Sequence, residues 1–318
     1  MSRDAASSPS PLSAPDGRAD VAATRWGDNL TGAAWMIASG LAATAMSVAI
    51  KALSDSIETP MIAFLRCLLG LWVVIPMLLS GALLRMRLTR PWLHLLRGCL
   101  MGAALNLGFY ALATLNLTTA TILFFLAPIF ATMLAGPVLG QSVGAPRWAA
   151  VAAGFLGAVI ILQPGYAPLD WGMLAAVGSA ACFSVSLMLA SIIGREDGAR
   201  TVLVTSTAVA TVICLPFAAP VWALPDTPSL WAWTALLVLS SSLRMYADIK
   251  AYATGEASFV APFAYVRLFF VALAGWLIFS QIPESHTLLG GAVIAAATLY
   301  IAYRERKLGL RIASGPAA

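Results

Sequence analysis

Residues 256–279 read EASFVAPFAYVRLFFVALAGWLIF, an apolar stretch with one acid at its start and one arginine inside it. A helix of about 20 apolar residues crosses the hydrocarbon core of a bilayer. The stretch does not alternate apolar and polar residues, as the strands of a membrane β-barrel do. It therefore predicts a transmembrane helix, with Pro262 and Arg267 both well inside it.

Nine other stretches have the same character, with apolar residues throughout and Pro, Gly or charged residues at their ends. The chain is 60% hydrophobic and 10% charged, whereas roughly 25% of the residues of a soluble domain are charged. Such a chain cannot cover a water-soluble surface, so we interpret each stretch as a membrane-spanning helix. These further spans are 31–52, 60–82, 92–114, 118–138, 146–163, 170–193, 201–219, 229–249 and 286–303.

The basic residues predict how the chain is oriented, because Lys and Arg favour cytoplasmic loops. Of the 19 Lys and Arg residues, 14 lie in the two tails and in alternate loops, and only Lys51 lies in the other loops. The remaining four lie inside spans. We therefore expect a multi-pass protein of the inner (plasma) membrane with both termini cytoplasmic. Residues 1–30, rich in Ala, Ser and Pro, are predicted to be a disordered tail, and residues 304–318 a second tail.

The chain repeats itself at an offset of 140 residues, where Gly32 matches Gly172 and Pro76 matches Pro216. Each half then contains five spans, 31–163 for the first and 164–303 for the second. An odd number of spans makes the second half enter the membrane upside down. The predicted fold is thus an all-α membrane protein of ten transmembrane helices arranged as two inverted five-helix repeats, the plan of many secondary transporters.

Several short motifs, in this order and spacing, make the chain resemble the EamA-type members of the drug/metabolite transporter superfamily over about residues 30–306. The resemblance implies movement of small metabolites such as amino acids, nucleoside-like compounds or vitamins, and it favours export. The chain departs from the family at Gln141 and Gln281, where family members usually have Glu. The motifs are Phe64-Leu65-Arg66, Arg97, Phe109-Tyr110-Ala111-Leu112, Ala127-Pro128, Pro262 to Leu268, Gly275 to Phe279 and Gly290-Gly291.

These observations together predict a secondary transporter that moves a small polar or zwitterionic, amino-acid-like metabolite by alternating access, as an exporter. The alternatives are a passive channel or facilitator, and an importer of a vitamin or nucleoside-like metabolite. Coupling to protons or to a counter-substrate is possible. We expect no enzyme activity, cofactor, metal site or nucleic-acid partner, because neither His94 nor His286 belongs to an HExxH motif and no GxSxG is present.

Charged residues inside the spans are the strongest candidates for a substrate site, because charge at membrane depth is costly. Arg267 lies eleven residues after Glu256, about 16 Å at 1.5 Å per residue, which is too deep to reach water along its side chain. It either binds an anionic substrate group or supports a broken helix. Arg66 is shallower and either binds substrate or snorkels. Arg97 and Arg244 are interpreted as anchors or local ion pairs, the latter with Asp248 at i+4.

Polar and aromatic side chains at i,i+4 spacing are the second group of candidates. Asn106 and Tyr110 share a face of the third span, and Ser242 and Tyr246 share a face of the eighth. Such pairs either bind a polar ligand or form interhelical hydrogen bonds. Tyr265 is a weaker candidate, because it points away from Arg267 on the same helix.

Two prolines lie well inside predicted spans, Pro128 in the fourth and Pro262 in the ninth. Proline removes a backbone amide and kinks a helix. These kinks are candidate hinges for alternating access, and static packing is the alternative.

Overall fold

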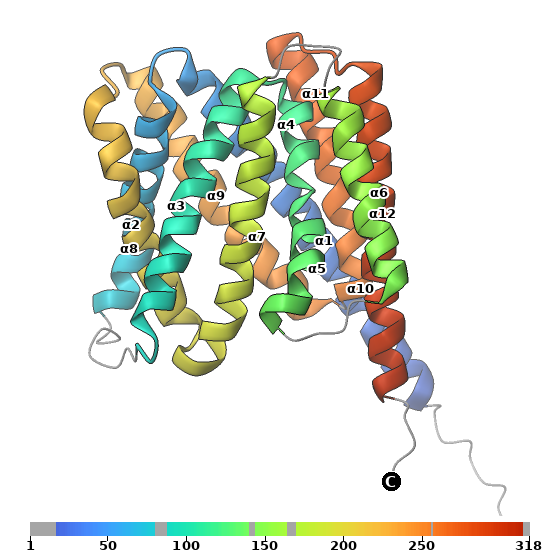
Figure 1. The fold of residues 1–318 in the computed structure, drawn as a ribbon. Helices are drawn as coiled ribbons and strands as arrows, with labels where there is room; N and C mark the ends of the chain where they lie inside the picture. Colours follow the sequence, from blue (N-terminus) through green and yellow to red (C-terminus); the bar gives the residue numbers. More distant parts are fainter. Residues whose placement is uncertain (1–16, 80–87, 140–143, 164–169, 256, 314–318) are drawn as a thin grey trace, which may run out of the picture.

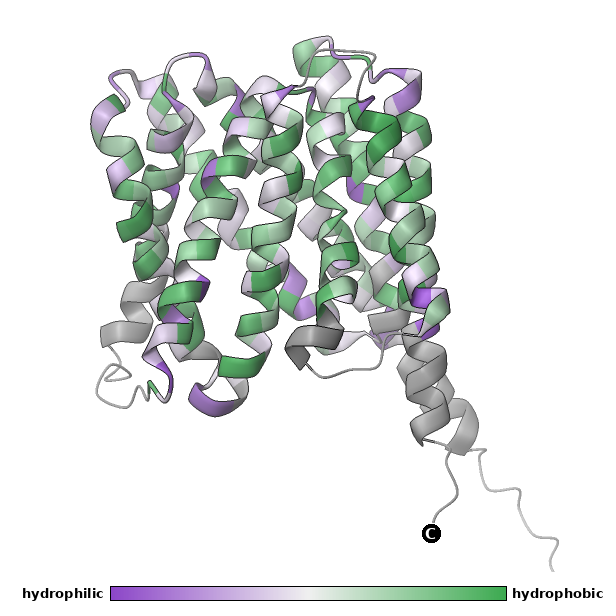
Figure 2. Cartoon of the chain, viewed as in Figure 1, coloured by the Kyte–Doolittle hydropathy of each residue, from purple (hydrophilic) through white to green (hydrophobic). Residues whose placement is uncertain are grey.

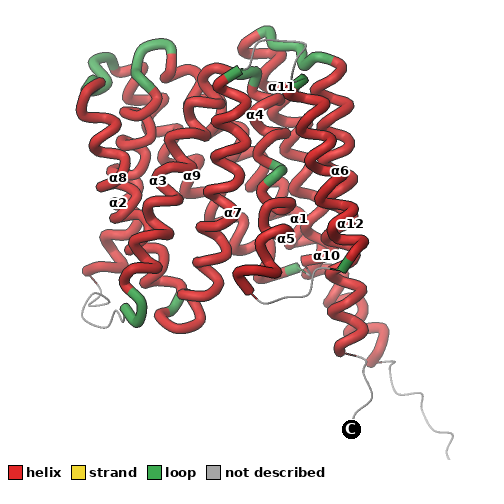
Figure 3. Tube along the Cα trace, in the orientation of Figure 1, coloured by secondary structure: helices red, strands yellow, loops and turns green. Residues whose placement is uncertain are grey.

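The computed structural model describes residues 17–79, 88–139, 144–163, 170–255 and 257–313. All of these residues belong to helices or to the loops and turns that join them, without a strand (Figure 3). The helices are α1 (Gly17–Ser54), α2 (Thr59–Leu79), α3 (Pro91–Thr114), α4 (Leu117–Phe124), α5 (Ala127–Leu139), α6 (Ala145–Leu162), α7 (Trp171–Asp197), α8 (Ala199–Ala218), η2 (Ala219–Val221), α9 (Pro228–Thr254), α10 (Ala257–Val260), η3 (Ala261–Tyr265), α11 (Val266–Phe279) and α12 (Ser285–Ala313).

Each of the ten predicted spans coincides with one of these helices or with a series of them, and together they form a bundle (Figure 1). Apolar residues colour most of its height, and hydrophilic residues gather towards its two ends (Figure 2). Eight described segments are long and apolar enough to cross a membrane. We call the end from which α1 and α12 project the terminal end, and the other the opposite end.

The first and last helices extend into the segments predicted to be tails. α1 begins at Gly17, so residues 17–30, predicted to be disordered, are helical, and α12 continues to Ala313. The last proline of the amino-terminal segment is Pro15. Beyond it no proline interrupts the chain before the end of α1, so α1 can start well before its membrane-spanning part.

The fourth and ninth spans are broken rather than continuous. The fourth consists of α4 and α5 with a break at Phe125 and Leu126, and Pro128 is the second residue of α5. The ninth consists of α10, the 3₁₀ helix η3 containing Pro262, and α11. Proline is tolerated at the first turn of a helix, whereas in the interior it removes a backbone hydrogen bond and bends or breaks the helix. The predicted kinks are therefore present, and their action as hinges stays a prediction.

The helix contacts follow the inverted repeat. α1 packs mainly on α9, and their counterparts in the other half, α7 and α3, pack on each other in the same way. The second spans of the halves, α2 and α8, meet at one side of the bundle, and the fifth spans, α6 and α12, meet at the other (Figure 1). A helix and its counterpart run in opposite directions, so the two halves are related by a pseudo-two-fold axis in the membrane plane.

We expect reporter fusions to place the terminal end in the cytoplasm, because 14 of the 19 basic residues flank that end of the spans. Alkaline phosphatase fused after Asp170 or Pro225 should be active, and the same reporter fused after Arg90 should be inactive. Phosphatase activity at Arg90 together with inactivity at Asp170 would reverse the orientation.

Candidate functional site

The broken ninth span places Arg267 inside the bundle as the second residue of α11. α1 passes close to this point, since a Cβ atom added to Gly40 would lie 3.5 Å from the Cα of Arg267. The Nε atom of Arg267 is buried and has no hydrogen-bond partner among the described residues. A buried donor without a hydrogen-bond partner is costly, so the Nε position is short of an acceptor.

Three arginines and one aspartate, which we call the arginine cluster, interact in series, and Arg66 is linked to Arg267 only through Arg244. Arg267 is repelled electrostatically by Arg244 and attracted by Asp248, and Arg244 is also repelled by Arg66. Arg244 Nε lies 3.8 Å from Asp248 Oδ2, which is the i,i+4 contact expected from the sequence. The cluster therefore keeps an excess of positive charge.

The single acid of the arginine cluster is already engaged. Asp248 accepts a hydrogen bond from Ser39 of α1 in addition to its contact with Arg244. One carboxylate cannot neutralise three guanidinium groups, so an anionic group from outside the chain would satisfy the remaining donors. Arginine binds carboxylates and phosphates through two parallel hydrogen bonds.

Two aromatic rings stack where the two broken spans meet. The rings of Phe125 and Tyr265 lie 4.7 Å apart at an angle of 18°. Phe125 sits in the break of the fourth span and Tyr265 ends η3 in the ninth, and the two residues are 140 positions apart in the sequence. The stack thus joins equivalent positions of the two halves, two residues from Arg267.

The predicted pair on the eighth span lies partly outside the arginine cluster. Tyr246 is half exposed, makes an edge contact with Trp35 at 5.6 Å, and has Lys250 Nζ 5.7 Å from its ring centre. The hydroxyl of Ser242 donates to the carbonyl of Val238 in its own helix at 2.8 Å. Neither side chain shows an unsatisfied group that requires a ligand.

The two residues of the predicted pair on the third span, Asn106 and Tyr110, lie in different environments. Asn106 Nδ2 donates to Gly102 O at 2.9 Å and to the Sγ of Cys214 on α8 at 3.2 Å, and its Oδ1 is buried without a partner among the described residues. Tyr110, 40% exposed, lines an open groove between α3 and α7 together with Trp171. Asn106 therefore offers a free acceptor inside the bundle, whereas Tyr110 faces outwards.

Gln281, where the family resemblance implies a Glu, supports the start of α4. Its Oε1 accepts a hydrogen bond from the backbone amide of Leu117, the first residue of α4, at 3.0 Å. The amide oxygen satisfies one of the free donors at a helix start, which a carboxylate would also do. The other departure, Gln141, lies outside the described residues.

Sequence reasoning paired Asp248 with Arg244 but missed the contribution of Ser39 and Phe125 to this region. Ser39 and Asp248 come from helices α1 and α9, more than 200 positions apart, so no local pattern joins them. The 140-residue offset did carry a signal for Phe125, because it pairs that residue with Tyr265.

Comparison with protein-family models matches the EamA-like transporter family twice, at residues 30–163 and 170–303. The two matches begin 140 residues apart. They cover nearly all of the ten spans.

Individual relatives are similar over nearly their whole length. An S-adenosylmethionine uptake transporter of Rickettsia felis is 31% identical over 280 residues, covering 87% of this chain and 94% of the relative. A riboflavin transporter of Vibrio cholerae is 32% identical over 286 residues, covering 89% and 96%. A pseudopaline exporter of Pseudomonas aeruginosa is 26% identical over 266 residues, covering 82% and 92%. A solved crystal structure shares the fold with a TM-score of 0.56 at 16% identity, covering 87% of this chain and 98% of its own.

Proposed function

The chain belongs to the EamA-like transporter family, and from this premise we propose that it imports a heterocyclic metabolite bearing an anionic group across the bacterial inner membrane. It is a multi-pass transporter of small metabolites and not an enzyme. Alternating access, with the two halves rocking around the arginine cluster, is the mechanism we propose.

Import replaces the export that the family resemblance favoured. A relative of 31% identity that is named an uptake transporter supports import. The relative named an exporter is less similar, at 26% identity. The direction of transport is therefore proposed from similarity. Net efflux of substrate in a direct flux measurement would reverse it.

The unpaired Nε of Arg267 is the main observation in favour of an anionic substrate. Together with Arg66 and Arg244 it gives the site more positive charge than Asp248 can balance. The stacked rings of Phe125 and Tyr265 next to it form a surface on which a flat heterocycle packs. Most amino acids, the substrate class favoured by the sequence, carry a carboxylate but no flat heterocycle that would pack on these rings.

We expect uptake by reconstituted vesicles to saturate with substrate concentration, because a carrier exposes one central site alternately to each side. The screen should compare labelled riboflavin, S-adenosylmethionine, nucleosides and amino acids, with and without a pH gradient. Flux that rises linearly without saturation would favour the passive channel or facilitator instead.

Matched ligands test the charge of the site directly. S-adenosylhomocysteine lacks the sulfonium charge of S-adenosylmethionine, and riboflavin 5′-phosphate adds an anionic group to riboflavin. We expect the more negative member of each pair to compete better, by about tenfold for a difference of roughly 1.4 kcal/mol. A preference for S-adenosylmethionine over S-adenosylhomocysteine would contradict the proposed substrate class.

A further inference from the structure

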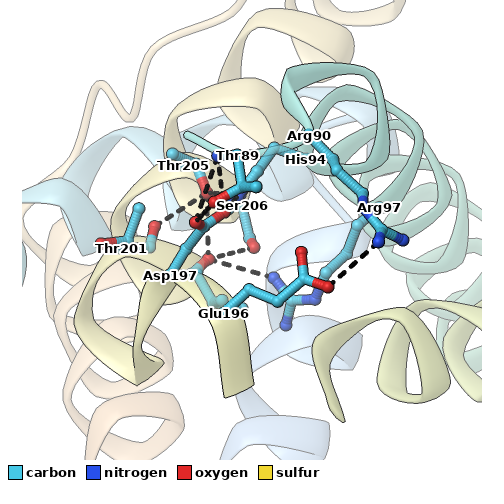
Figure 4. Close-up of polar contacts among 10 residues, drawn as sticks. Thr89, Arg90, His94, Arg97, Glu196, Asp197, Thr201, Thr205 and Ser206 are labelled. Carbon is cyan, nitrogen blue, oxygen red and sulfur yellow. Dashed lines mark hydrogen bonds and ion pairs between the residues drawn. The ribbon is translucent and has the colours of Figure 1, made fainter. Parts of the chain in front are cut away.

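A second buried polar group, separate from the arginine cluster, ties the two halves together at the terminal end (Figure 4). His94 near the start of α3 lies 2.9 Å from Asp197, the last residue of α7, measured from Nε2 to Oδ2. Its other nitrogen, Nδ1, lies 2.8 Å from the hydroxyl of Thr205 on α8. The side chains of His94 and Asp197 are 4% and 0% exposed. We call these residues, with Thr89, the His94 latch.

The hydrogen bonds indicate which atoms carry protons. The hydroxyl of Thr205 has one proton, and the carbonyl of Thr201, 2.8 Å away in the same helix, accepts it. The oxygen of Thr205 then accepts from Nδ1 of His94. The carboxylate of Asp197 also accepts, from His94 Nε2, from the Thr89 amide at 3.1 Å and from the Thr89 hydroxyl. Both ring nitrogens of His94 face acceptors, so the arrangement fits the doubly protonated imidazolium.

The other charged side chains near His94 are bonded to other partners. On its own helix, Arg90 Nη2 pairs with Glu196 Oε1 of α7 at 3.2 Å near the surface. The buried Arg97 donates to the carbonyls of Ser186 and Val202 at 3.1 Å each, which is the anchoring role expected from the sequence. Among the described side chains, α8 presents hydroxyl groups to His94 rather than charges. Hydrogen bonds from His94 and then from Thr89 hold the pKa of Asp197 below its usual value.

The equivalent place at the opposite end lacks this chemistry. The residues 140 positions away in the other half, all within the described part of the chain, are buried and do not titrate. The hydroxyl of Thr234 donates within its own helix, to Leu230 O at 2.8 Å. The pairs are His94 with Thr234, Asp197 with Ile57, Thr205 with Leu65 and Arg97 with Leu237. The position of the His94 latch in one half is therefore occupied by a threonine and three apolar residues in the other.

We propose that His94 and Asp197 form a proton-binding site that holds the terminal end of the transporter closed while the proton is bound. With the proton bound, the imidazolium and carboxylate hold α3 of the first half to α7 of the second. When the proton leaves to water, Asp197 stays buried without its counter-charge, which favours exposure of the carboxylate. The hydroxyl of Thr205 then turns to donate to the free ring nitrogen. The latch weakens as pH rises, and the terminal end opens.

The proton itself can be observed without measuring transport, because the chain has only two histidines. Protein labelled with ¹⁵N-histidine and purified without a histidine tag should give two sets of ring signals, assigned by His286→Gln. We expect both nitrogens of His94 to be protonated at pH 6. In Thr205→Val, which removes the acceptor at nearly constant shape, His94 should lose a proton at a lower pH. A neutral His94 ring in the native protein at pH 6 would overturn the proposal.

Uptake measurements then test whether the latch controls the terminal end, an inference that rests on the proposed transport function. Acidifying the compartment that the terminal end faces should slow uptake about fivefold or more, a common size for coupling between two sites. His94→Gln and Asp197→Asn should each remove this dependence, and His286→Gln should retain it. Unchanged pH dependence in His94→Gln would refute control by the latch. If no uptake is seen at all, the result counts against the proposed function. The protonation of His94 is then tested by the ¹⁵N spectra alone.

Discussion

Replacing Arg267 with alanine is expected to lower uptake of an anionic substrate by about 30-fold or more, since removing one partner of a buried charge pair costs about 2–5 kcal/mol. The variant loses the guanidinium whose Nε is unpaired and reduces the positive excess of the arginine cluster. Uptake of a neutral analogue of the same ring should fall much less. Initial rates over a range of concentrations would separate weaker binding from slower turnover.

Arg267→Lys separates a binding role from general charge. Lysine keeps the positive charge but loses the flat two-pronged donor. We expect about a tenfold loss, because one hydrogen bond to a charged group is worth roughly 1.5 kcal/mol. Arg90, whose side chain is half exposed, provides the matched control, and Arg90→Ala should transport the substrate nearly normally.

A structural role for Arg267 predicts a different pattern. Alanine would then lower the yield of folded protein, or would reduce the uptake of anionic and neutral substrates equally. Folded yield should therefore be measured by gel filtration beside both uptake assays. Full transport of the anionic substrate by well-folded Arg267→Ala would disprove the site.

Replacing Gly290 with valine is expected to prevent the two halves from closing along α6 and α12. A Cβ atom at Gly290 would lie 2.5 Å from the backbone oxygen of Gly157, and a Cβ atom at Gly157 would lie 2.8 Å from the oxygen of Gly290. A carbonyl in a helix cannot rotate away, so the helices must separate. Small residues allow this close approach, which drives helix association in a membrane.

Alanine at Gly290 should destabilise the protein by about 1–3 kcal/mol, the usual cost of overpacking, and valine by more. Thermal unfolding in detergent, followed by light scattering and gel filtration, measures the effect. Gly70→Ala is the control, because Gly70 lies inside α2 with nothing within 4 Å of an added Cβ. Equal melting temperatures for the Gly290→Ala and Gly70→Ala variants would show that the α6–α12 contact is looser than described.

The spans, their number and their inverted arrangement could be predicted from the sequence. The hydrocarbon core requires each crossing segment to satisfy its own backbone hydrogen bonds and to be apolar along about 20 residues. Both requirements are local, so the sequence of residues 256–279 alone is enough to predict a span there. The offset of 140 residues and the placement of the basic residues then relate one segment to another without any knowledge of contacts.

The breaks in two spans were only partly predictable. Pro128 and Pro262 indicate where a continuous helix is costly. The sequence does not state how each break is built, and the structure forms a short turn before α5 and the 3₁₀ helix η3 before α11. Only the structure shows that Phe125 and Tyr265 stack where the two breaks meet.

The tertiary structure alone decided which polar groups meet. Asp248 appeared in the sequence as a local partner of Arg244, and the structure adds Ser39 of α1. His94 offered no metal motif and no catalytic neighbour in sequence, yet it lies against Asp197, more than 100 positions away. The physical reason is that a bilayer selects each helix for its length and mean hydropathy, whereas the partner of a buried side chain depends on how two helices turn towards each other.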